Sequence, residues 1–149
     1  MADTDDTVLR PEPVFTPDNA FFWEGAARGE LLIKQCAACS RYWHPPRPMC
    51  PEYHATNMVP ARMSGLGTVY SWGMQIHPFP HGFAAPPIVA LIDLDEGPRL
   101  VSNVVGVDPR TLQNGLRVTV MFEATQGGRA VPVFRPLDAA VEASARSEP

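Results

Sequence analysis

The clearest pattern in the chain is β-type alternation of apolar and polar positions in its second half. Residues 68–76 alternate aromatic or aliphatic side chains with smaller or polar ones, which predicts a half-buried strand. The continuous apolar run at 88–94 predicts a second strand that is covered on both faces. A third strand is expected at 100–107. The turn-rich residues 95–98 separate these two, so we expect a hairpin.

Two further strands and one short connection complete this pattern. Residues 118–122 alternate again, and residues 131–134 supply a fifth strand. Between the third and fourth strands, Asp108 and Pro109 open a short helical turn that Gly115 ends. Because so many strands need closure to hide their edges, residues 63–136 are expected to form a five-stranded Greek-key barrel of the OB type. The fold class is therefore mainly β.

A helical segment is expected before these strands, at residues 13–30. Residues 16–18 (Thr-Pro-Asp) favour a helix start with Thr16 as its cap, and Gly29 favours its end. The aromatic side chains of Phe21, Phe22 and Trp23 cannot all point to one face of a helix. Either the helix is wedged between two layers of this chain, or these three residues dock onto a partner protein.

Residues 31–62 have the spacing of a small metal-bound module. Cys36 and Cys39 form a C-x2-C pair, and Cys50 follows after ten residues. Tetrahedral zinc takes four nitrogen or sulfur ligands from two tight turns, and a fourth thiolate would fall at Tyr53. We predict that His54, one residue further on, replaces it, so that a closed structural zinc site results. The alternative is a ribbon that has lost its metal and is held by packing alone.

Composition and charge narrow the class of protein. The chain has 149 residues, of which 12 are basic and 16 acidic, so its formal net charge is −4. This charge disfavours nucleic-acid binding, which depends on basic residues that neutralise phosphates. No apolar run is long enough to span a membrane, and the polar, acidic start lacks a secretion signal, so a soluble cytoplasmic protein is expected. Residues 1–12 and 137–149 are expected to be disordered tails.

Candidate catalytic groups are few. His77 and His81 lie in one loop, but no carboxylate or nucleophile is near them in sequence. Asp93, Asp95 and Glu96 lie at a hairpin tip, where solvated turn residues are expected. His44 is expected to be a packed or surface histidine. No catalytic residue is therefore assigned, and an independent enzyme is the least favoured class.

The motifs together carry a resemblance to a known family. They are Phe22-Trp23 with Gly29, the C-x2-C pair, Pro45-Pro46-Arg47-x-x-Cys50-Pro51, Gly67-x-Val69-x-Ser71-Trp72 and Gly115-x-x-Val118. Over residues 13–136 this order resembles the DUF35 family, whose members pair a rubredoxin-like zinc ribbon with an OB-fold. The sequence departs from the family's four cysteines at Tyr53.

The resemblance implies a function without catalytic residues of its own. It implies an accessory subunit that docks onto a thiolase-fold aldolase or thiolase, or a MaoC-like hydratase, in steroid or lipid catabolism. Acyl-CoA is expected near the junction of the two proteins, and Arg41, Arg47 and Arg62 are the cationic candidates for its phosphates. The alternative is a single-stranded nucleic-acid-binding module, since OB barrels and zinc ribbons also serve that purpose.

Overall fold

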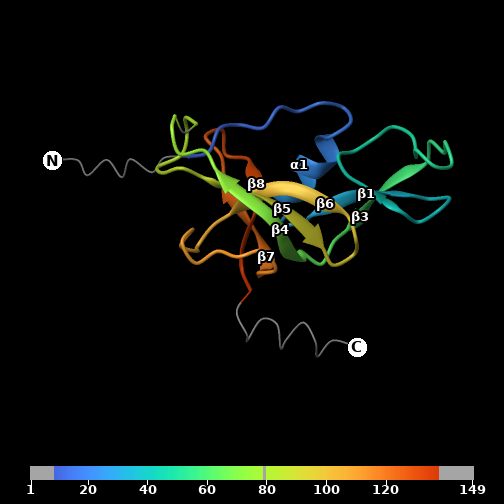
Figure 1. Ribbon diagram of the computed structural model, residues 1–149. Coiled ribbons are helices and arrows are strands. Elements are labelled where there is room, and N and C mark those ends of the chain that lie inside the picture. The colour runs from blue at the N-terminus through green and yellow to red at the C-terminus, as the bar shows by residue number, and fades with distance from the viewer. Residues whose placement is uncertain (1–8, 79, 138–149) are drawn as a thin grey trace.

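The computed structural model describes residues 9–78 and 80–137 and consists of a helix, a small sheet and a barrel. Figure 1 shows the small sheet projecting to one side of the barrel, with the helix where the two meet. The mainly β architecture that the sequence predicts is confirmed. The elements are α1 (Ala20–Ala27), β1 (Leu32–Cys36), β2 (Tyr42–Trp43), β3 (Met58–Arg62), β4 (Leu66–Met74), β5 (Ile88–Leu94), β6 (Arg99–Val104), β7 (Arg117–Ala124) and β8 (Ala130–Pro136).

The barrel has the topology expected of an OB-fold. Its strands close in the order β4-β5-β6-β8-β7, and β7 pairs with β4 again. All neighbours are antiparallel except β6 and β8, which pair in parallel because the chain crosses over before β7. The inward side chains of the strands, among them Val69, Ile92, Val118 and Phe134, are almost fully buried and form one core. The predicted five-stranded barrel is therefore confirmed.

Strand β5 has the predicted bounds but is not covered on both faces. Ile88, Ala90 and Ile92 point into the barrel, whereas Val89 is 43% exposed on the outside. The prediction of two covered faces is wrong, because a closed barrel buries only its inner face and nothing in the described residues covers this part of the outer one. The apolar run is therefore a mark of an exposed apolar surface rather than of a second layer.

Two other boundaries differ from the sequence-based expectation. Strand β4 begins and ends two residues earlier than expected, and β6 ends at Val104. The expected helical turn after Asp108 is a hydrogen-bonded turn, closed by the backbone N–H groups of Thr111 and Leu112, which donate to the carbonyl oxygen of Asp108. It does not continue into a helix, because Gly115 takes a left-handed backbone with φ of 92° and returns the chain to the barrel.

Helix α1 begins later than predicted and ends as predicted. Asn19 rather than Thr16 precedes its first turn, because Thr16 closes a separate turn in which its carbonyl oxygen accepts from the N–H of Ala20. At the other end, Gly29 adopts φ of 75°, and the N–H of Glu30 donates to the carbonyl oxygen of Gly25. This is the glycine-dependent helix end that the sequence indicates. No helix among the described residues is long and apolar enough to cross a membrane.

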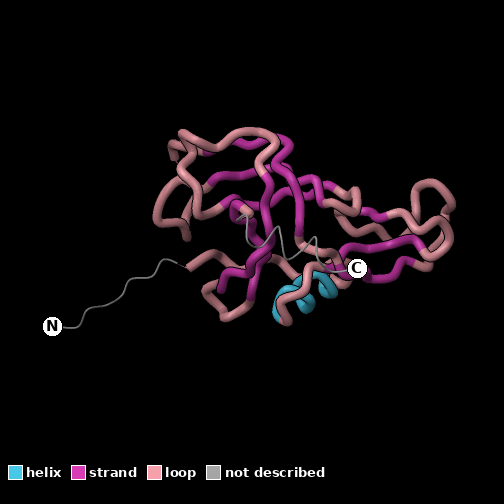
Figure 2. Tube along the Cα trace, turned by 90° about the horizontal axis from the view of Figure 1, so that it is seen from below, coloured by secondary structure: helices cyan, strands magenta, loops and turns pink. Residues whose placement is uncertain are grey.

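The aromatic residues of α1 join the small sheet to the barrel. The helix packs against β1 on one side and β8 on the other, and Figure 2 shows it beneath the junction of the two sheets. Phe22 is buried in the common core, and its ring meets that of Trp23 edge-on at 4.8 Å. Phe21 lies beneath the ammonium group of Lys34, 4.6 Å from ring centre to nitrogen. These contacts favour the interpretation in which the helix is wedged between two layers of this chain.

Residues 9–12, which composition places in a loose tail, lie along the barrel. Arg10 forms a bridge with Thr125 and donates to the carboxylate of Glu123 at 2.5 Å. Glu12 accepts from the N–H of Gly127 at 2.6 Å and from the buried hydroxyl of Thr125. These contacts join residues more than a hundred positions apart. Leu137, the first residue of the other expected tail, donates its N–H to the carbonyl oxygen of Arg117 at 2.9 Å. The remaining expected tail residues, 1–8 and 138–149, lie outside the described residues.

Candidate metal centre

Two tight turns of the small sheet carry the three cysteines. Cys36 ends β1, and the N–H of Ser40 donates to its carbonyl oxygen at 2.8 Å, which closes a turn around Cys39. Cys50 lies in the loop between β2 and β3, where the N–H of His54 donates to its carbonyl oxygen at 2.9 Å. These turns hold the cysteine side chains on facing sides of the ribbon.

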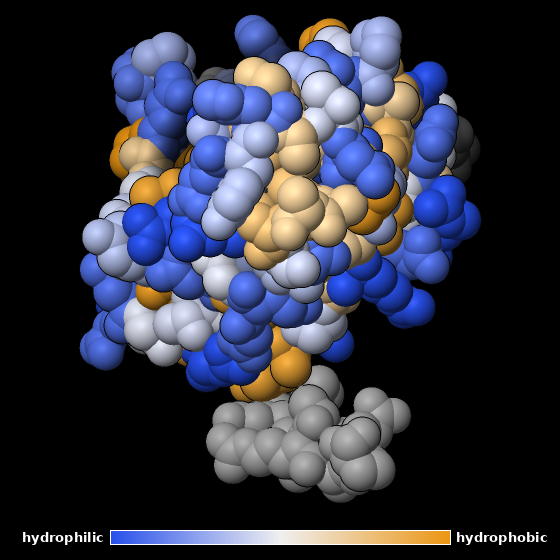
Figure 3. Space-filling model, turned by 90° about the vertical axis from the view of Figure 1, so that its right-hand side faces the viewer, coloured by the Kyte–Doolittle hydropathy of each residue, from blue (hydrophilic) through white to orange (hydrophobic). Residues whose placement is uncertain are grey.

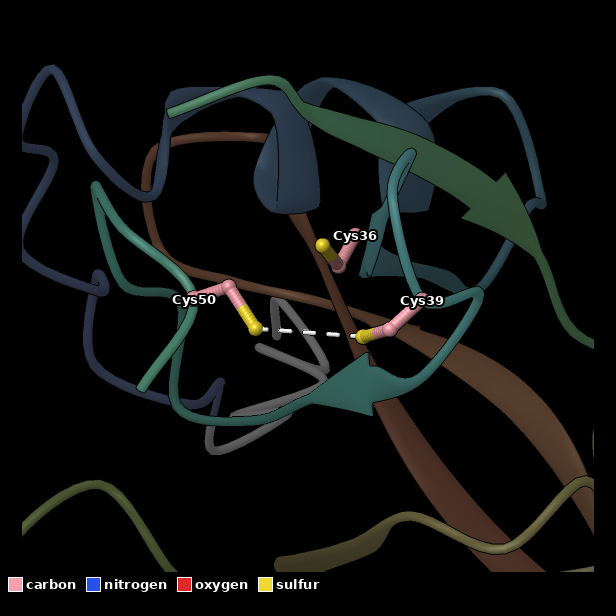
Figure 4. Close-up of side chains that lie close together, drawn as sticks. All are labelled: Cys36, Cys39 and Cys50. Atoms are coloured by element: carbon pink, nitrogen blue, oxygen red, sulfur yellow. Dashed lines mark hydrogen bonds between the residues drawn. The ribbon is translucent and has the colours of Figure 1, made fainter. Parts of the chain in front are cut away.

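The three thiols converge on one point. Their sulfur atoms all lie within 4.8 Å of one another, and Sγ of Cys39 is 3.8 Å from Sγ of Cys50 (Figure 4). Cys36 and Cys50 are fully buried, while Cys39 is half-buried. The sequence predicts this trio from spacing alone, and the structure brings it together.

His54 and Tyr53 do not join this cluster. Both are exposed, Tyr53 by 66%, and the sulfur cluster in the described part of the chain contains no histidine nitrogen. His54 instead has a left-handed backbone, with φ of 53°. Its role as the fourth zinc ligand stays a prediction.

Backbone donors and burial act in opposite directions on the thiols. Burial raises the pKa of Cys50, but hydrogen bonds from the backbone N–H groups of Tyr53 and Glu52 and from the neighbouring thiols together hold its pKa below the usual value. The N–H of Arg41 lowers the pKa of Cys39, but burial and the two neighbouring thiols together raise it above the usual value. Three converging soft donors, two of them buried, fit structural zinc, which would cross-link the two turns.

The end of the ribbon that carries these turns faces solvent. Ala37, Ala38 and Met49 are exposed there. Figure 3 looks onto this side of the molecule and shows weakly apolar residues at its centre, surrounded by hydrophilic ones. The turns are therefore accessible from outside even though two of the cysteines are not.

The other polar candidates are engaged in structural contacts or exposed. His77 and His81 are exposed in the loop after β4. Asp93 pairs with Arg99 across the hairpin, and Glu96 accepts from the N–H of Ser64. Asp95 pairs with Arg117, whose hydrogen bonds are the largest cause that lowers the pKa of this carboxyl. The three carboxylates hold the hairpin tip in place.

Most arginines of the described chain are also paired with acids. Arg41 pairs with Glu52 and Arg62 lies 4.0 Å from Glu30, whereas Arg47 has no ion pair among the described residues. Among the described residues, Arg47 is thus the one of these three candidates for phosphate contacts whose guanidinium forms no ion pair. A continuous cationic groove for nucleic acid is therefore not formed by these residues.

Sequence reasoning missed an apolar surface on the outside of the barrel. Tyr70, Val89 and Val101 are all exposed on β4, β5 and β6, and Val101 pairs in register with Leu91. Next to them, a cavity of about 310 Å³ opens between Val101, Phe22 and Trp23. The indole nitrogen of Trp23 is buried and has no hydrogen-bond partner among the described residues. The signal for this surface was the apolar side chains of Val89 and Leu91 on β5 and Val101 on β6, at positions that alternate with the inward-facing ones.

The fold and the cysteine cluster define a class, a zinc ribbon joined to an OB-fold barrel. Family models agree: residues 23–59 match "ChsH2, rubredoxin-like zinc ribbon domain" and residues 61–123 match "ChsH2, C-terminal OB-fold domain". A "DUF35 domain-containing scaffold protein" of Methanocaldococcus jannaschii is 31% identical over 62% of this chain and 67% of that protein. The chain belongs to the DUF35 family.

Other relatives carry the names of enzyme subunits. A "Probable enoyl-CoA hydratase alpha subunit" of Thermomonospora curvata is 40% identical over 86% of this chain. A "3-oxo-4,17-pregnadiene-20-carboxyl-CoA hydratase alpha subunit" of Mycobacterium tuberculosis is 32% identical over 78% of this chain. The chain spans 40% and 37% of the length of these two relatives. A solved structure named "Ltp2-ChsH2(DUF35) aldolase" aligns with a TM-score of 0.79 and 40% identity, over 84% of this chain and 98% of that one.

Proposed function

We propose that the chain is a non-catalytic accessory subunit that docks onto and stabilises a thiolase-fold aldolase acting on acyl-CoA substrates of steroid or lipid catabolism. One observation carries this proposal. The chain aligns with 98% of a chain in the solved structure named "Ltp2-ChsH2(DUF35) aldolase". The alternative partner in this proposal is a MaoC-like hydratase; the names of two relatives, both hydratase alpha subunits, support a hydratase as partner. The contacts that occupy the hairpin carboxylates are consistent with catalysis in the partner.

The outer face of the barrel is our candidate for the docking surface. We define it by Tyr70, Val89 and Val101, which are exposed on three adjacent strands. Exposed apolar groups that lie side by side often mark protein interfaces. Tyr70 is held there by the guanidinium of Arg99, 3.5 Å above its ring, so it presents a rigid aromatic surface of the kind that interfaces favour.

The aromatic residues of α1 have a smaller part in this proposal. Phe22 is buried, so its removal would unfold the junction rather than test docking. Phe21 and Trp23 are partly buried, and Trp23 lines the cavity that Val101 also borders. A contact between these two residues and the partner stays a prediction. The apolar cavity beside Trp23 and Val101 is our candidate for the place where an acyl chain lies near the interface.

Co-expression with a thiolase-fold aldolase as candidate partner tests the proposal. Native mass spectrometry should show a hetero-complex, and Val101→Asp should weaken it by about tenfold or more, because a carboxylate would be buried without a partner. Ile76→Asp is the matched control: Ile76 is 62% exposed and Val101 63%, but Ile76 lies in a loop outside the docking surface.

Two results would count against the proposal in different ways. Absence of any complex with either an aldolase or a hydratase partner would overturn the accessory role itself. A complex that Val101→Asp and Ile76→Asp affect equally would keep the role but remove the docking surface from it. Thermal unfolding of each variant alone shows that the change is in binding rather than in folding.

A further inference from the structure

The two cysteine turns of the ribbon have the same backbone. Ser40 donates its N–H to the carbonyl oxygen of Cys36, and His54 donates to that of Cys50, each four residues on. Ser40 has φ of 61° and His54 has φ of 53°, and these are the two non-glycine residues with positive φ in the described part of the chain. The turns therefore correspond residue for residue.

This correspondence assigns a place to each residue of the second turn. Cys50 matches Cys36, and Tyr53 matches Cys39. His54 matches Ser40, the residue that closes the turn and is exposed in both cases. The ligand position of the second turn is thus occupied by Tyr53, whose side chain is 66% exposed. Because phenol is not among the usual zinc ligands, this turn supplies one ligand where the first supplies two.

The three thiols already have the spacing of a zinc site. Two ligands of a tetrahedral site with Zn–S bonds of about 2.3 Å lie about 3.8 Å apart. Sγ of Cys39 lies 3.8 Å from Sγ of Cys50, and Sγ of Cys36 is within 4.8 Å of both. The donor set is therefore arranged for the metal although one of four positions has no ligand from the described residues.

We propose that the ribbon binds zinc through Cys36, Cys39 and Cys50 alone and leaves the fourth coordination position open to an external small thiol. Water occupies this position in the absence of thiol. A thiol is the proposed external ligand because sulfur donors are among the soft ligands that suit zinc. Access comes from the side of Tyr53, where the turn residues are exposed. This inference does not depend on the proposed function.

Cobalt substitution of the full chain tests the proposal directly. Co²⁺ in place of zinc, with a phosphine reductant, gives a sulfur-to-metal absorption whose intensity follows the number of thiolates. Addition of 2-mercaptoethanol should raise this intensity by about one third, from three thiolates to four. The visible bands should shift in the same titration, while remaining those of a tetrahedral site.

Two variants separate the open site from a closed one. Tyr53→Cys restores the second C-x2-C, so it should show four thiolates without added thiol, no response to 2-mercaptoethanol, and zinc affinity higher by about tenfold or more. His54→Gly keeps the left-handed turn and should leave the spectrum and the thiol response unchanged.

Two outcomes would overturn the proposal. A wild-type spectrum that does not respond to thiol but changes in His54→Gly would make His54 the fourth ligand and overturn the proposal. Failure of the wild-type chain to bind Co²⁺ or zinc, where Tyr53→Cys binds both, would overturn it as well.

Discussion

The imidazole of His44 lies against the helix rather than in the metal centre. Its ring centre is 5.6 Å from that of Phe22. His44 also lines a cavity together with Leu91 and Arg99 of the barrel. Burial lowers the pKa of His44 below its ordinary value of 6.5. The folded state therefore favours the neutral imidazole, because burial among aromatic and aliphatic side chains penalises the charged form.

This burial makes the stability of the folded chain depend on pH. Between the lowered folded pKa and 6.5 the unfolded chain binds more protons, so the free energy of unfolding should fall as pH decreases from 7.5 through 6.5 and level off below the folded pKa. His44→Phe keeps a ring against Phe22 but removes the titration. Urea unfolding at several pH values should show a shallower loss of stability for this variant.

The comparison with His44→Phe also separates the histidine from the thiols. Both proteins carry the same three cysteines, so acid-driven loss of zinc affects both curves and cancels in their difference. A difference between wild type and variant that does not change with pH would show that His44 is not the titrating group.

At the scale of single elements, strand β4 depends on a glycine for its approach to β5. A Cβ built on Gly67 would lie 2.7 Å from the carbonyl oxygen of Asp93 and 2.9 Å from a methyl carbon of Ile92. Both neighbours belong to the barrel wall, and one is backbone, so neither can move cheaply. Gly73, in the same strand, has no heavy atom within 4 Å of its Cβ position.

The two glycines therefore form a matched pair for mutation. Gly67→Ala should destabilise the chain by about 2–4 kcal/mol, because it forces β4 away from β5. Gly73→Ala should stay within about 0.5 kcal/mol of wild type. Chemical denaturation followed by tryptophan fluorescence measures both. Equal stabilities for the two variants would mean that the barrel tolerates a wider spacing at this end of β4.

The strands could be predicted from the sequence because alternation reports the inward face directly. What alternation does not report is what covers the outer face, so β5 was expected to be covered where Val89 is exposed. Helix α1 shows the same limit: Gly29 marks its end through a local backbone requirement, but its start depends on a separate turn at Thr16 that competes for the same residues.

Contacts over the whole molecule were the least predictable from sequence. The three cysteines are close in the chain and have a motif, whereas Arg10 and Glu123 are 113 residues apart and have none. The place of His54 in its turn was also not predictable from spacing. Its correspondence to Ser40 rather than to Cys39 follows from the left-handed backbone that His54 and Ser40 share. Spacing alone could place a histidine near the metal but could not orient it.

The same arrangement predicts that the ribbon and the barrel depend on zinc to different extents. The barrel closes on its own core around Phe134, but the ribbon has three short strands, and its two turns are joined by the converging thiols and by the exposed ion pair of Arg41 with Glu52. Removal of zinc by a chelator under reducing conditions should therefore increase amide hydrogen exchange in β1 and β3 by about tenfold or more, while β5 and β7 keep their protection. Cys39→Ser should reproduce this pattern without a chelator, because it removes one ligand and leaves the barrel untouched. Equal loss of protection in both parts would show instead that Phe22 and the rest of α1 couple them into one cooperative unit.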